Sequence, residues 1–578
     1  MHRHLRFALC LVVLFTSLLT IADEADAAKR PPNIVFFLVD DMGWNDTEPY
    51  GNKFHETPNV TKLAKQGMRF TNAYAACPVC SPTRASIMSG KYPATLNLTD
   101  FIPGHWRPYE KLVVPKMNLQ LPLKEVSLAE CVKPAGYITG SFGKWHLGGP
   151  SHYPGQQGFD DWVVTGGRHF APNFRTTPKK EVKKGEYLGD FLTRQAERFM
   201  EENRDKPFLL YLPHYAVHIP LEAKQKLVEK YAKKLSKSEF RPKVVVSVRA
   251  GIAADIARIG NHPLGTVDRE IQNHPLGRQI TNVNTKNVSL RLVQNVYSFK
   301  KSVSFDDLQK FVIEITTKFR TVKMPPGYSV EIKLSPVNHP TYAAMVEHID
   351  QSLGRIMKKL DDLKLADNTI LIFFSDNGGL YRRFDERGPA VMSNHPLRAE
   401  KGTVYEGGIR EPCIIRWPGK VKPGTTCDVP ISSVDFWPTI AEISGTAAKH
   451  THKVDGVSLL PLLKQTGSLA DRALYWHYPH YHHMAPAGAI RYGDYKLIEN
   501  FETNELELYN LSKDIGESNN LIGSDPRTTK KLHDMLKAWR KKVGARMPTL
   551  NPNFDPKRRY EWKRRPRPRK KPQGKKNR

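Results

Sequence analysis

Residues 80–91 read CSPTRASIMSGK and are the residues that most clearly suggest chemical reactivity. They begin with a cysteine that is followed by a proline and an arginine. Pro82 suits the first turn of a helix, because its missing N–H would have no partner there. The pattern predicts a helix that begins at Cys80, with Arg84 one turn on and able to reach back. A helix N-terminus and a nearby guanidinium lower the pKa of a thiol, which favours a reactive cysteine. A buried structural cysteine is the alternative.

Oxygen-bearing side chains follow two apolar runs. Asp40 and Asp41 come directly after residues 33–39, NIVFFLV, and Asp376 and Asn377 follow residues 369–375, TILIFFS. Carboxylate and amide oxygens are hard ligands that suit Ca²⁺ or Mg²⁺. An isolated Asp-Asp pair is more often a turn or a helix cap. Two such strand ends in one domain favour the metal site.

Lysine and histidine residues form three further motifs. Residues 143–148 read GKWHLG, which places Lys144 and His146 on one face of an extended segment. Residues 211–220 read YLPHYAVHIP and residues 401–412 read KGTVYEGGIREP. Taken singly, the lysine–histidine pair is also compatible with an ordinary surface strand.

Together these motifs closely resemble the signatures of the type I, formylglycine-dependent sulfatases, arylsulfatase-like members of the alkaline phosphatase superfamily. The resemblance covers about residues 31–235 and 339–556. It implies that Cys80 is oxidised by a formylglycine-generating or sulfatase-maturating enzyme to Cα-formylglycine, whose hydrated aldehyde is the nucleophile. It also implies a bound Ca²⁺, with Mg²⁺ as the alternative, whose ligands are Asp40, Asp41, Cys80, Asp376 and Asn377.

The same resemblance implies a role for each remaining site residue. Three cationic side chains would stabilise the negative charge of the sulfuryl group: Arg84, Lys144 and Lys401. His146 would hydrogen bond the formylglycine and help to deprotonate its second hydroxyl, while His218 would lie near the leaving-group oxygen. His214 is expected to be structural, and Glu406 and Arg410 are expected to pair and hold their loop.

The implied reaction is hydrolysis of sulfate esters, on sulfated polysaccharides or oligosaccharides. Residues 477–483 read HYPHYHH, and we predict that His477, His480 and His482 bind the sugar. A surface or metal-scavenging histidine cluster is the alternative. Two other functions remain open: a phosphonate monoester or phosphodiester hydrolase of the same superfamily, and an inactive carbohydrate-binding relative.

The elements that must position these residues indicate an α/β fold. The run at 33–39 is continuously apolar, as in a strand buried on both faces, and 369–374 repeats the design. Apolar residues at helical spacing predict an amphipathic helix over 341–363. Helix then strand, with polar residues at the strand's end, predicts a large doubly wound mixed sheet with helices on both faces. Ligands bind at the carboxyl ends of such strands.

The chain divides into several regions. We predict a catalytic domain over 29–455 and, over 456–556, a smaller antiparallel β-sheet subdomain with strands near 473–476, 489–491, 495–498 and 505–509 and a packed helix at 528–542. Residues 239–338 depart from the family's pattern, with strand-like runs near 288–296 and 311–315. We expect this insert to be a surface excursion that hydrolysis does not need.

The ends of the chain carry signals of their own. Residues 1–28 read as a secretory signal peptide, so we expect an exported protein, periplasmic or extracellular, and no later segment reads as a membrane span. Residues 557–578 hold thirteen Lys/Arg against Glu561, in a chain of net charge +30. This tail is expected to be disordered, with a polyanion as its possible partner and nucleic acid excluded for lack of a reader module. Five cysteines beyond Cys10 are too few for a disulfide scaffold, and the pairing of Cys77 is left open.

Overall fold

The computed structural model describes residues 30–561 apart from 105, 236, 238–242, 251–263, 290–291, 301, 304, 322–327, 336 and 384–389. The segment read as a signal peptide, 1–28, and most of the basic tail, 562–578, lie outside the described residues. Among the described helices, none combines the length and the apolar character needed to cross a membrane.

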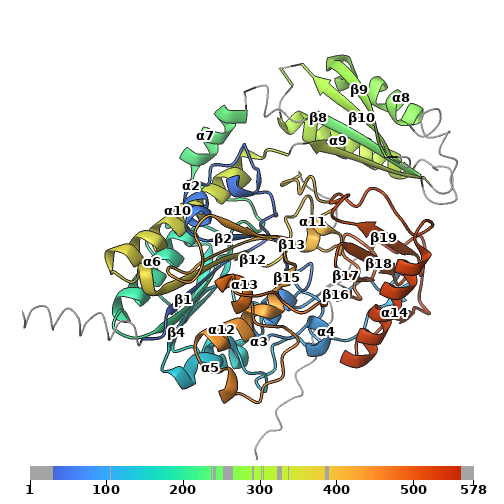
Figure 1. Cartoon of the computed structure of the whole chain (residues 1–578). Coiled ribbons are helices and arrows are strands. Elements are labelled where there is room, and N and C mark those ends of the chain that lie inside the picture. The colour runs from blue at the N-terminus through green and yellow to red at the C-terminus, as the bar shows by residue number, and fades with distance from the viewer. Residues whose placement is uncertain are drawn as a thin grey trace, which may run out of the picture.

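A large mixed β-sheet forms the centre of the molecule (Figure 1). Its strand order is β14-β2-β13-β12-β1-β7-β4-β5-β6, with β15 beside β2. The neighbours from β12 to β5 run parallel, whereas β13, β2 and β6 bring antiparallel pairings. The predicted mixed α/β sheet is therefore confirmed. The strands are β1 (Asn33–Val39), β2 (Met68–Tyr74), β4 (Ile138–Gly143), β5 (Asp161–Gly167), β6 (Phe174–Thr177), β7 (Phe208–Pro213), β12 (Thr369–Ser375), β13 (Arg410–Arg416), β14 (Thr425–Cys427) and β15 (Ile431–Ser432).

Helices cover both faces of this sheet, which is why the central strands are apolar throughout. Alternate residues of β1 point into two separate cores, Phe36 into one and Phe37 into the other. One face carries α2 (Pro58–Gln66), α6 (Leu188–Glu202) and α10 (Pro340–Asp362), and the other carries α3 (Cys80–Ser89), α5 (Leu128–Val132) and α12 (Phe436–Ile443). The helix predicted over 341–363 corresponds to α10.

A second, smaller antiparallel sheet lies beside the first, as predicted. It consists of β16 (Ala473–Tyr478), β17 (Ala487–Tyr492), β18 (Tyr495–Asn500) and β19 (Leu506–Asn510), and α14 (Pro526–Val543) packs on it through Leu532, Leu536 and Trp539. The shorter elements are α4 (Pro93–Leu96), α7 (Gln225–Leu235), α11 (Glu406–Ile409), α13 (Leu460–Lys464), β3 (Leu112–Val113) and β20 (Thr549–Leu550).

The described residues between 243 and 335 form a compact unit, here called the inserted module, which Figure 1 shows above the main body. Its elements are β8 (Lys243–Ala250), α8 (Gly265–Asn273), β9 (Ile280–Ser289), β10 (Leu292–Phe299), α9 (Phe305–Thr321) and β11 (Tyr328–Ser335), with strand order β11-β8-β10-β9. This is the βαββαβ arrangement of ferredoxin-like folds. The strand expected at 311–315 is wrong: it lies in α9, because Phe311, Val312 and Ile315 recur at helical spacing and fill the module's core.

Candidate active site

Cys80 is the first residue of α3, as predicted, and its side chain is buried. The Nδ1 atom of His146 lies 3.2 Å from the Cys80 sulfur, and Nε2 of the same ring lies 2.6 Å from the carbonyl oxygen of Ile102. A carbonyl can only accept a hydrogen bond, so Nε2 carries the proton and Nδ1 accepts from position 80. His146 is thus oriented as a hydrogen-bond acceptor for whatever group stands there.

The pKa of the Cys80 thiol is not lowered, which differs from the expectation from the sequence. Burial raises the pKa of Cys80, and the nearby Lys144 and Lys401 offset this only in part. Arg84 does not reach back to position 80 with its hydrogen bonds. Its Nε and Nη2 atoms each lie 2.8 Å from Asp376 Oδ2, and Nη1 donates to the main-chain oxygen of Lys144 at 2.7 Å. The hydrogen bonds of Arg84 therefore hold a carboxylate and a loop, and not the cysteine.

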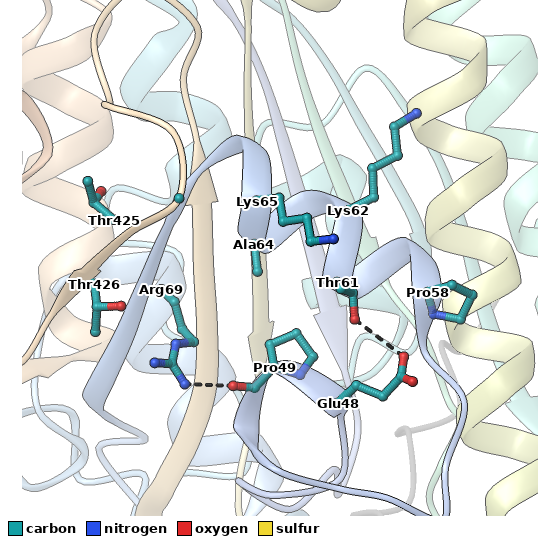
Figure 2. Close-up of a pocket in the computed structure, with 11 residues that line it drawn as sticks. Glu48, Pro49, Pro58, Thr61, Lys62, Ala64, Lys65, Arg69, Thr425 and Thr426 are labelled. Atoms are coloured by element: carbon teal, nitrogen blue, oxygen red, sulfur yellow. Dashed lines mark hydrogen bonds between the residues drawn. The ribbon is translucent and has the colours of Figure 1, made fainter.

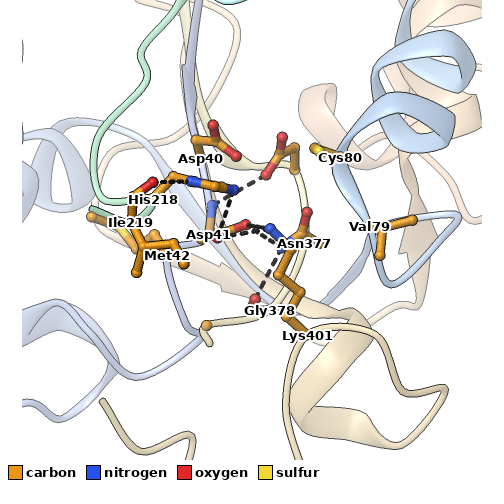
Figure 3. Close-up of polar contacts among 12 residues, drawn as sticks. Asp40, Asp41, Met42, Val79, Cys80, His218, Ile219, Asn377, Gly378 and Lys401 are labelled. Atoms are coloured by element: carbon orange, nitrogen blue, oxygen red, sulfur yellow. Dashed lines mark hydrogen bonds and ion pairs between the residues drawn. The ribbon is translucent and has the colours of Figure 1, made fainter. Parts of the chain in front are cut away.

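Asp40, Asp376 and Cys80 converge at the predicted metal site, the carboxyl ends of β1 and β12. Figure 3 shows Asp40 and Cys80 there. Their ligand atoms all lie within 4.8 Å of one another, and all three residues are buried. Two further oxygens, Asp40 Oδ1 and Asn377 Oδ1, are buried and have no hydrogen-bond partner among the described residues. Buried unpaired oxygens are costly, and here they add hard oxygen donors of the kind that Ca²⁺ or Mg²⁺ prefers. The residues fit a divalent cation.

The two carboxyl groups of this cluster have opposite electrostatic surroundings. Burial alone would raise the pKa of Asp40, but the ammonium group of Lys144, which pairs with Asp40 Oδ2, holds it well below its usual range. Burial and the adjacent charge of Asp40 raise the pKa of Asp376 to about 7, despite its bonds to Arg84. Like charges at such short range resist joint ionisation unless a cation neutralises them.

Asp41 lies next to this cluster and is engaged by side chains. Its Oδ1 accepts from Lys401 Nζ at 2.6 Å and from Asn377 Nδ2 at 2.8 Å, and its Oδ2 lies 3.7 Å from His218 Nε2 (Figure 3). Asp41 has a φ of 61°, in the left-handed region. That conformation costs a non-glycine residue about 1 kcal/mol and is tolerated best by Asp and Asn. The turn brings the second carboxylate to Lys401.

His218 and the Lys144 loop complete the site. The His218 ring is about one-fifth exposed, and burial, then Lys401, lowers its pKa to about 4. Lys144 and His146 both face the site, yet not from an extended segment: β4 ends at Gly143, and His146 has a φ of 59°. Burial, then Lys144, lowers the pKa of His146 to about 3, which keeps this ring neutral.

The residues predicted to be structural form buried networks. His214 is fully buried, with its ring 4.7 Å from that of Phe37 and its Nε2 3.2 Å from Ser352 Oγ. Arg410 Nε donates to Glu406 Oε2 at 2.6 Å. Lys496, on β18, pairs with Glu406 at 2.8 Å and with Glu517 at 2.9 Å, so this network joins the two sheets. Cys77 is buried and free in the structure.

The three histidines predicted to bind sugar lie in different places. His477 is buried, with Nε2 3.0 Å from the main-chain oxygen of Arg546, which is a structural arrangement. His480 is also buried, 2.8 Å from Thr99 Oγ1. His482 abuts the Lys401 loop, since a Cβ built on Gly402 would lie 2.0 Å from its Nδ1. Only His482 among them is thus placed beside a site residue.

Sequence reasoning missed two contacts. Tyr215 lies under Lys144, with the Nζ atom 5.2 Å from the ring centre, and His483 Nδ1 lies 2.8 Å from the main-chain oxygen of Lys401. Both residues belong to motifs already singled out, at 211–220 and 477–483, but neither motif marks which member faces the site. Tyr215 adds cation–π attraction that holds Lys144 in place.

A surface cavity of about 720 Å³ lies elsewhere, where β14 pairs with β2 beside α2 (Figure 2). Its lining includes Lys62, Lys65 and Arg69, and it holds none of the predicted site residues. Arg69 donates to the main-chain oxygen of Pro49 at 2.6 Å, and Thr61 binds Glu48 (Figure 2). We therefore keep the strand-end cluster as the candidate site.

Comparison with known proteins decides the family. A sequence model of the Sulfatase family matches residues 32–446, and a model of the N-sulphoglucosamine sulphohydrolase C-terminal region matches residues 398–542. The chain belongs to the sulfatase family. It is 30% identical over 572 residues to a sulfatase of Formosa agariphila, covering 91% of this chain and 92% of that one. It is 28% identical over 454 residues to human N-acetylgalactosamine-6-sulfatase, covering 78% and 69%.

Solved structures show the same fold. The structure of Ps i-CgsB in complex with k-i-k-neocarrahexaose aligns with a TM-score of 0.62 at 23% identity, over 91% of this chain and 95% of that one. The structure of BT4656 in complex with D-glucosamine-2-N,6-O-disulfate aligns with a TM-score of 0.59 at 24% identity, over 89% and 98%. The chain is thus a sulfatase enzyme in fold and family.

Proposed function

We propose that this sulfatase hydrolyses sulfate esters of carbohydrates, with formylglycine formed from Cys80 and with a divalent cation, Ca²⁺, in the strand-end cluster. The observation that carries the proposal is the convergence of Cys80, Asp40 and Asp376 within 4.8 Å, with Lys144 and Lys401 at the same place. A nucleophile, a cation site and two positively charged side chains are what the transfer of a sulfuryl group requires.

The residues that would hold the cation are Asp40, Asp376 and Asn377, joined by position 80, with Asp41 beside them. When bound, a divalent cation supplies Lewis-acid polarisation and neutralises the adjacent carboxylates. When formed, hydrated formylglycine supplies the nucleophilic oxygen. Arg84 keeps Asp376 and the Lys144 loop in register through two hydrogen bonds and one ion pair. Binding of the sulfate oxygens and proton transfer are left to side chains of this protein.

Two lysines and two histidines perform those tasks. Lys144 and Lys401 bind the sulfate oxygens, because their flexible stems allow the ammonium groups to follow a group that changes geometry. His146 accepts a proton from position 80 at Nδ1, since its Nε2–H is held by Ile102. His218 turns Nε2 toward the leaving-group oxygen, because its Nδ1 faces the main-chain oxygen of Ile219 at 2.5 Å. Nε2 gives a proton to that oxygen after it has taken one from solvent, to which the ring is about one-fifth exposed.

Sulfated carbohydrate is the substrate class that the relatives' names support. Those names include an N-acetylgalactosamine-6-sulfatase and a structure in complex with a sulfated glucosamine. We also propose that the protein is exported through residues 1–28 and depends on a formylglycine-generating or sulfatase-maturating enzyme. Both proposals rest on sequence signals, the apolar run near the N-terminus and the motif that begins at Cys80.

The experiment compares matched esters. Purified protein, co-expressed with a maturating enzyme, is assayed on an aryl sulfate, on the corresponding aryl phosphate and on defined heparan, chondroitin, galactan and fucan oligosaccharides. We expect sulfate release from the aryl sulfate and from at least one oligosaccharide, with a much lower kcat/KM for the phosphate. A preference for the phosphate would contradict the proposal, and Lys401→Ala serves as the control for background hydrolysis.

A further inference from the structure

The inserted module forms hydrogen bonds to two residues, Tyr381 and Ala390, that lie between Asn377 and Lys401 in the sequence. Gln309, on α9, is only 3% exposed, and its side-chain amide bonds the main chain of Ala390 in both directions. Its Nε2 donates to the Ala390 oxygen at 3.1 Å, and its Oε1 accepts the Ala390 N–H at 2.5 Å. The Ala390 side chain is fully buried within the module's own core. A two-way amide contact fixes orientation as well as distance.

A second contact holds the part of the same segment near Tyr381. The parts near Tyr381 and near Ala390 are here called its two arms. The hydroxyl oxygen of Tyr381 accepts the N–H of Leu334, on β11, at 3.2 Å, and the Tyr381 ring packs against the module's core. The main-chain oxygen of Tyr381 accepts the N–H of Val391 at 2.7 Å. The arm at Tyr381 and the arm at Ala390 are therefore bonded to each other and to the module.

Both arms continue directly into the active site. The N–H groups of Tyr381 and Arg382 donate to Glu400 Oε2, at 2.6 and 3.0 Å, and Glu400 precedes Lys401. The Asn394 side chain bonds the N–H and the oxygen of Gly379, at 3.2 and 2.8 Å.

Gly379 closes the connection. Its oxygen also accepts the Lys401 N–H at 3.1 Å, and it lies two residues after Asn377. A Cβ on Gly379 would lie 2.5 Å from the Met392 side chain, so Gly379 is closely packed against its neighbours. A displacement of Ala390 or Tyr381 should therefore also shift Asn377 and Lys401.

We infer that the inserted module positions the active site, and that Gln309 is a positioning residue that acts through Ala390. The module holds the segment on which Asn377 and Lys401 stand, although it has its own core and none of its described residues belongs to the cluster. Its kinetic consequence rests on the proposed function, whereas its structural consequence does not. Deleting residues 239–338 should thus impair hydrolysis even of a small aryl sulfate, contrary to the expectation from sequence.

The test substitutes Gln309→Ala in the full-length enzyme. The matched control is Gln294→Ala, because Gln294 lies on the same module and donates to Ser247 Oγ at 3.0 Å, inside it. Hydrogen exchange is followed by mass spectrometry in metal-free protein, and kcat and KM are measured on a small aryl sulfate. We expect Gln309→Ala to raise exchange at 378–383 and 390–401 and to lower kcat roughly tenfold or more, since small misplacements of catalytic groups are costly. KM should change much less, and Gln294→Ala should alter neither readout.

A second variant at position 309 and a second site sharpen the result. Gln309→Glu keeps the acceptor for the Ala390 N–H but turns a buried carboxylate oxygen toward the Ala390 oxygen, so exchange and kcat should change at least as much as in Gln309→Ala. If Gln309→Ala does not fold, Tyr381→Phe removes only the acceptor of the Leu334 N–H and should show the same pattern, more weakly. Increased exchange confined to 243–335, with wild-type kcat, would overturn the inference. A wild-type enzyme without sulfatase activity would contradict the proposed function instead, and the exchange data would still decide this inference.

Discussion

Each lysine of the site is paired with an aspartate, Lys144 with Asp40 and Lys401 with Asp41. The Asp376 carboxylate is in turn held by Arg84, whose guanidinium is fully buried. Charges buried this deeply stabilise one another only as a complete set. Substitutions that remove one member should therefore affect both the metal site and the stability of the fold, and the two effects can be separated by choice of side chain.

Asp376 allows that separation. Asp376→Asn keeps an oxygen near Arg84 but removes a negative charge from the metal cluster, so we expect turnover to fall by at least about a hundredfold, since metal polarisation supplies several kcal/mol. Asp376→Ala should also cost about 3 kcal/mol of unfolding free energy, because it strands the buried guanidinium. Urea unfolding and a Ca²⁺ titration of the thermal midpoint measure the two effects. Full turnover of both variants after chelation would contradict the metal assignment.

His214 should make the fold sensitive to acid. Burial lowers the pKa of His214 to about 3, against 6.5 for an exposed imidazole, so the unfolded chain binds a proton that the folded chain refuses. Below pH 6.5, stability should therefore fall with falling pH, by up to about 1.4 kcal/mol per pH unit, until the pH approaches 3. His214→Gln should be less stable at pH 7.5 and should lose less stability between pH 6.5 and 4.5. Urea unfolding across this range measures it, with the exposed His395→Gln as control; parallel curves for wild type and His214→Gln would refute the claim.

At the scale of elements, the carboxyl ends of β1 and β12 create the site. These two strands are parallel neighbours, with Val39 opposite Ser375, so the residues that follow each strand must meet at one edge. The helix α3 approaches the same edge with its first residue, Cys80. The buried network of Glu406, Arg410 and Lys496 then fixes α11 and β13 against β18 of the smaller sheet.

Lys496→Met tests how far that network joins the two sheets. The Lys496 ammonium is fully buried and neutralises Glu406 and Glu517, so its removal should destabilise the protein by about 3–5 kcal/mol. Lys358→Met, which breaks an exposed pair with Asp362, should leave stability nearly unchanged. The measurement is urea unfolding of both variants. Equal midpoints for the two variants would show that the network does not couple the sheets.

Sequence patterns predicted some elements closely and failed on others for physical reasons. Strand β1 and helix α10 were predictable because long apolar runs and sustained helical spacing leave few alternatives. The run at 311–315 was misread as a strand, since a short apolar run in a helix that packs on a sheet looks the same. The loop after β4 was misread as extended, because the left-handed φ of His146 depends on tertiary contacts.

For the whole molecule, the residue types of the site and the Glu406–Arg410 pair could be predicted, but several other partners could not. Cys80, Asp40, Asp376 and Lys401 belong to distinctive motifs. Two contacts depend on side-chain directions in the assembled fold. Arg84 binds Asp376 rather than position 80, and Gln309 of the inserted module binds Ala390. Those contacts join residues more than 80 positions apart, which no local pattern records.

The basic tail should concentrate polyanionic substrate. Arg559 pairs with Glu110 and Glu502, so a truncation after Glu561 preserves these contacts and removes ten Lys/Arg among residues 562–578. At low salt, we expect this truncation to raise the KM for a sulfated polymer and to leave that for a small aryl sulfate unchanged. The difference should fade as the Debye length shrinks to about 8 Å at physiological salt. Equal KM values for the polymer at low salt would leave the tail without this role.

The most direct test of the catalytic account is mass spectrometry of the peptide that contains position 80, on preparations whose turnover of an aryl sulfate has been measured. Preparations made with different amounts of maturating enzyme will contain different fractions of the aldehyde. The account predicts that turnover per molecule rises in proportion to the fraction of formylglycine at position 80 and that Cys80→Ser, in the absence of an enzyme that modifies serine, is inactive. A fully active preparation with an intact thiol at position 80 would contradict it.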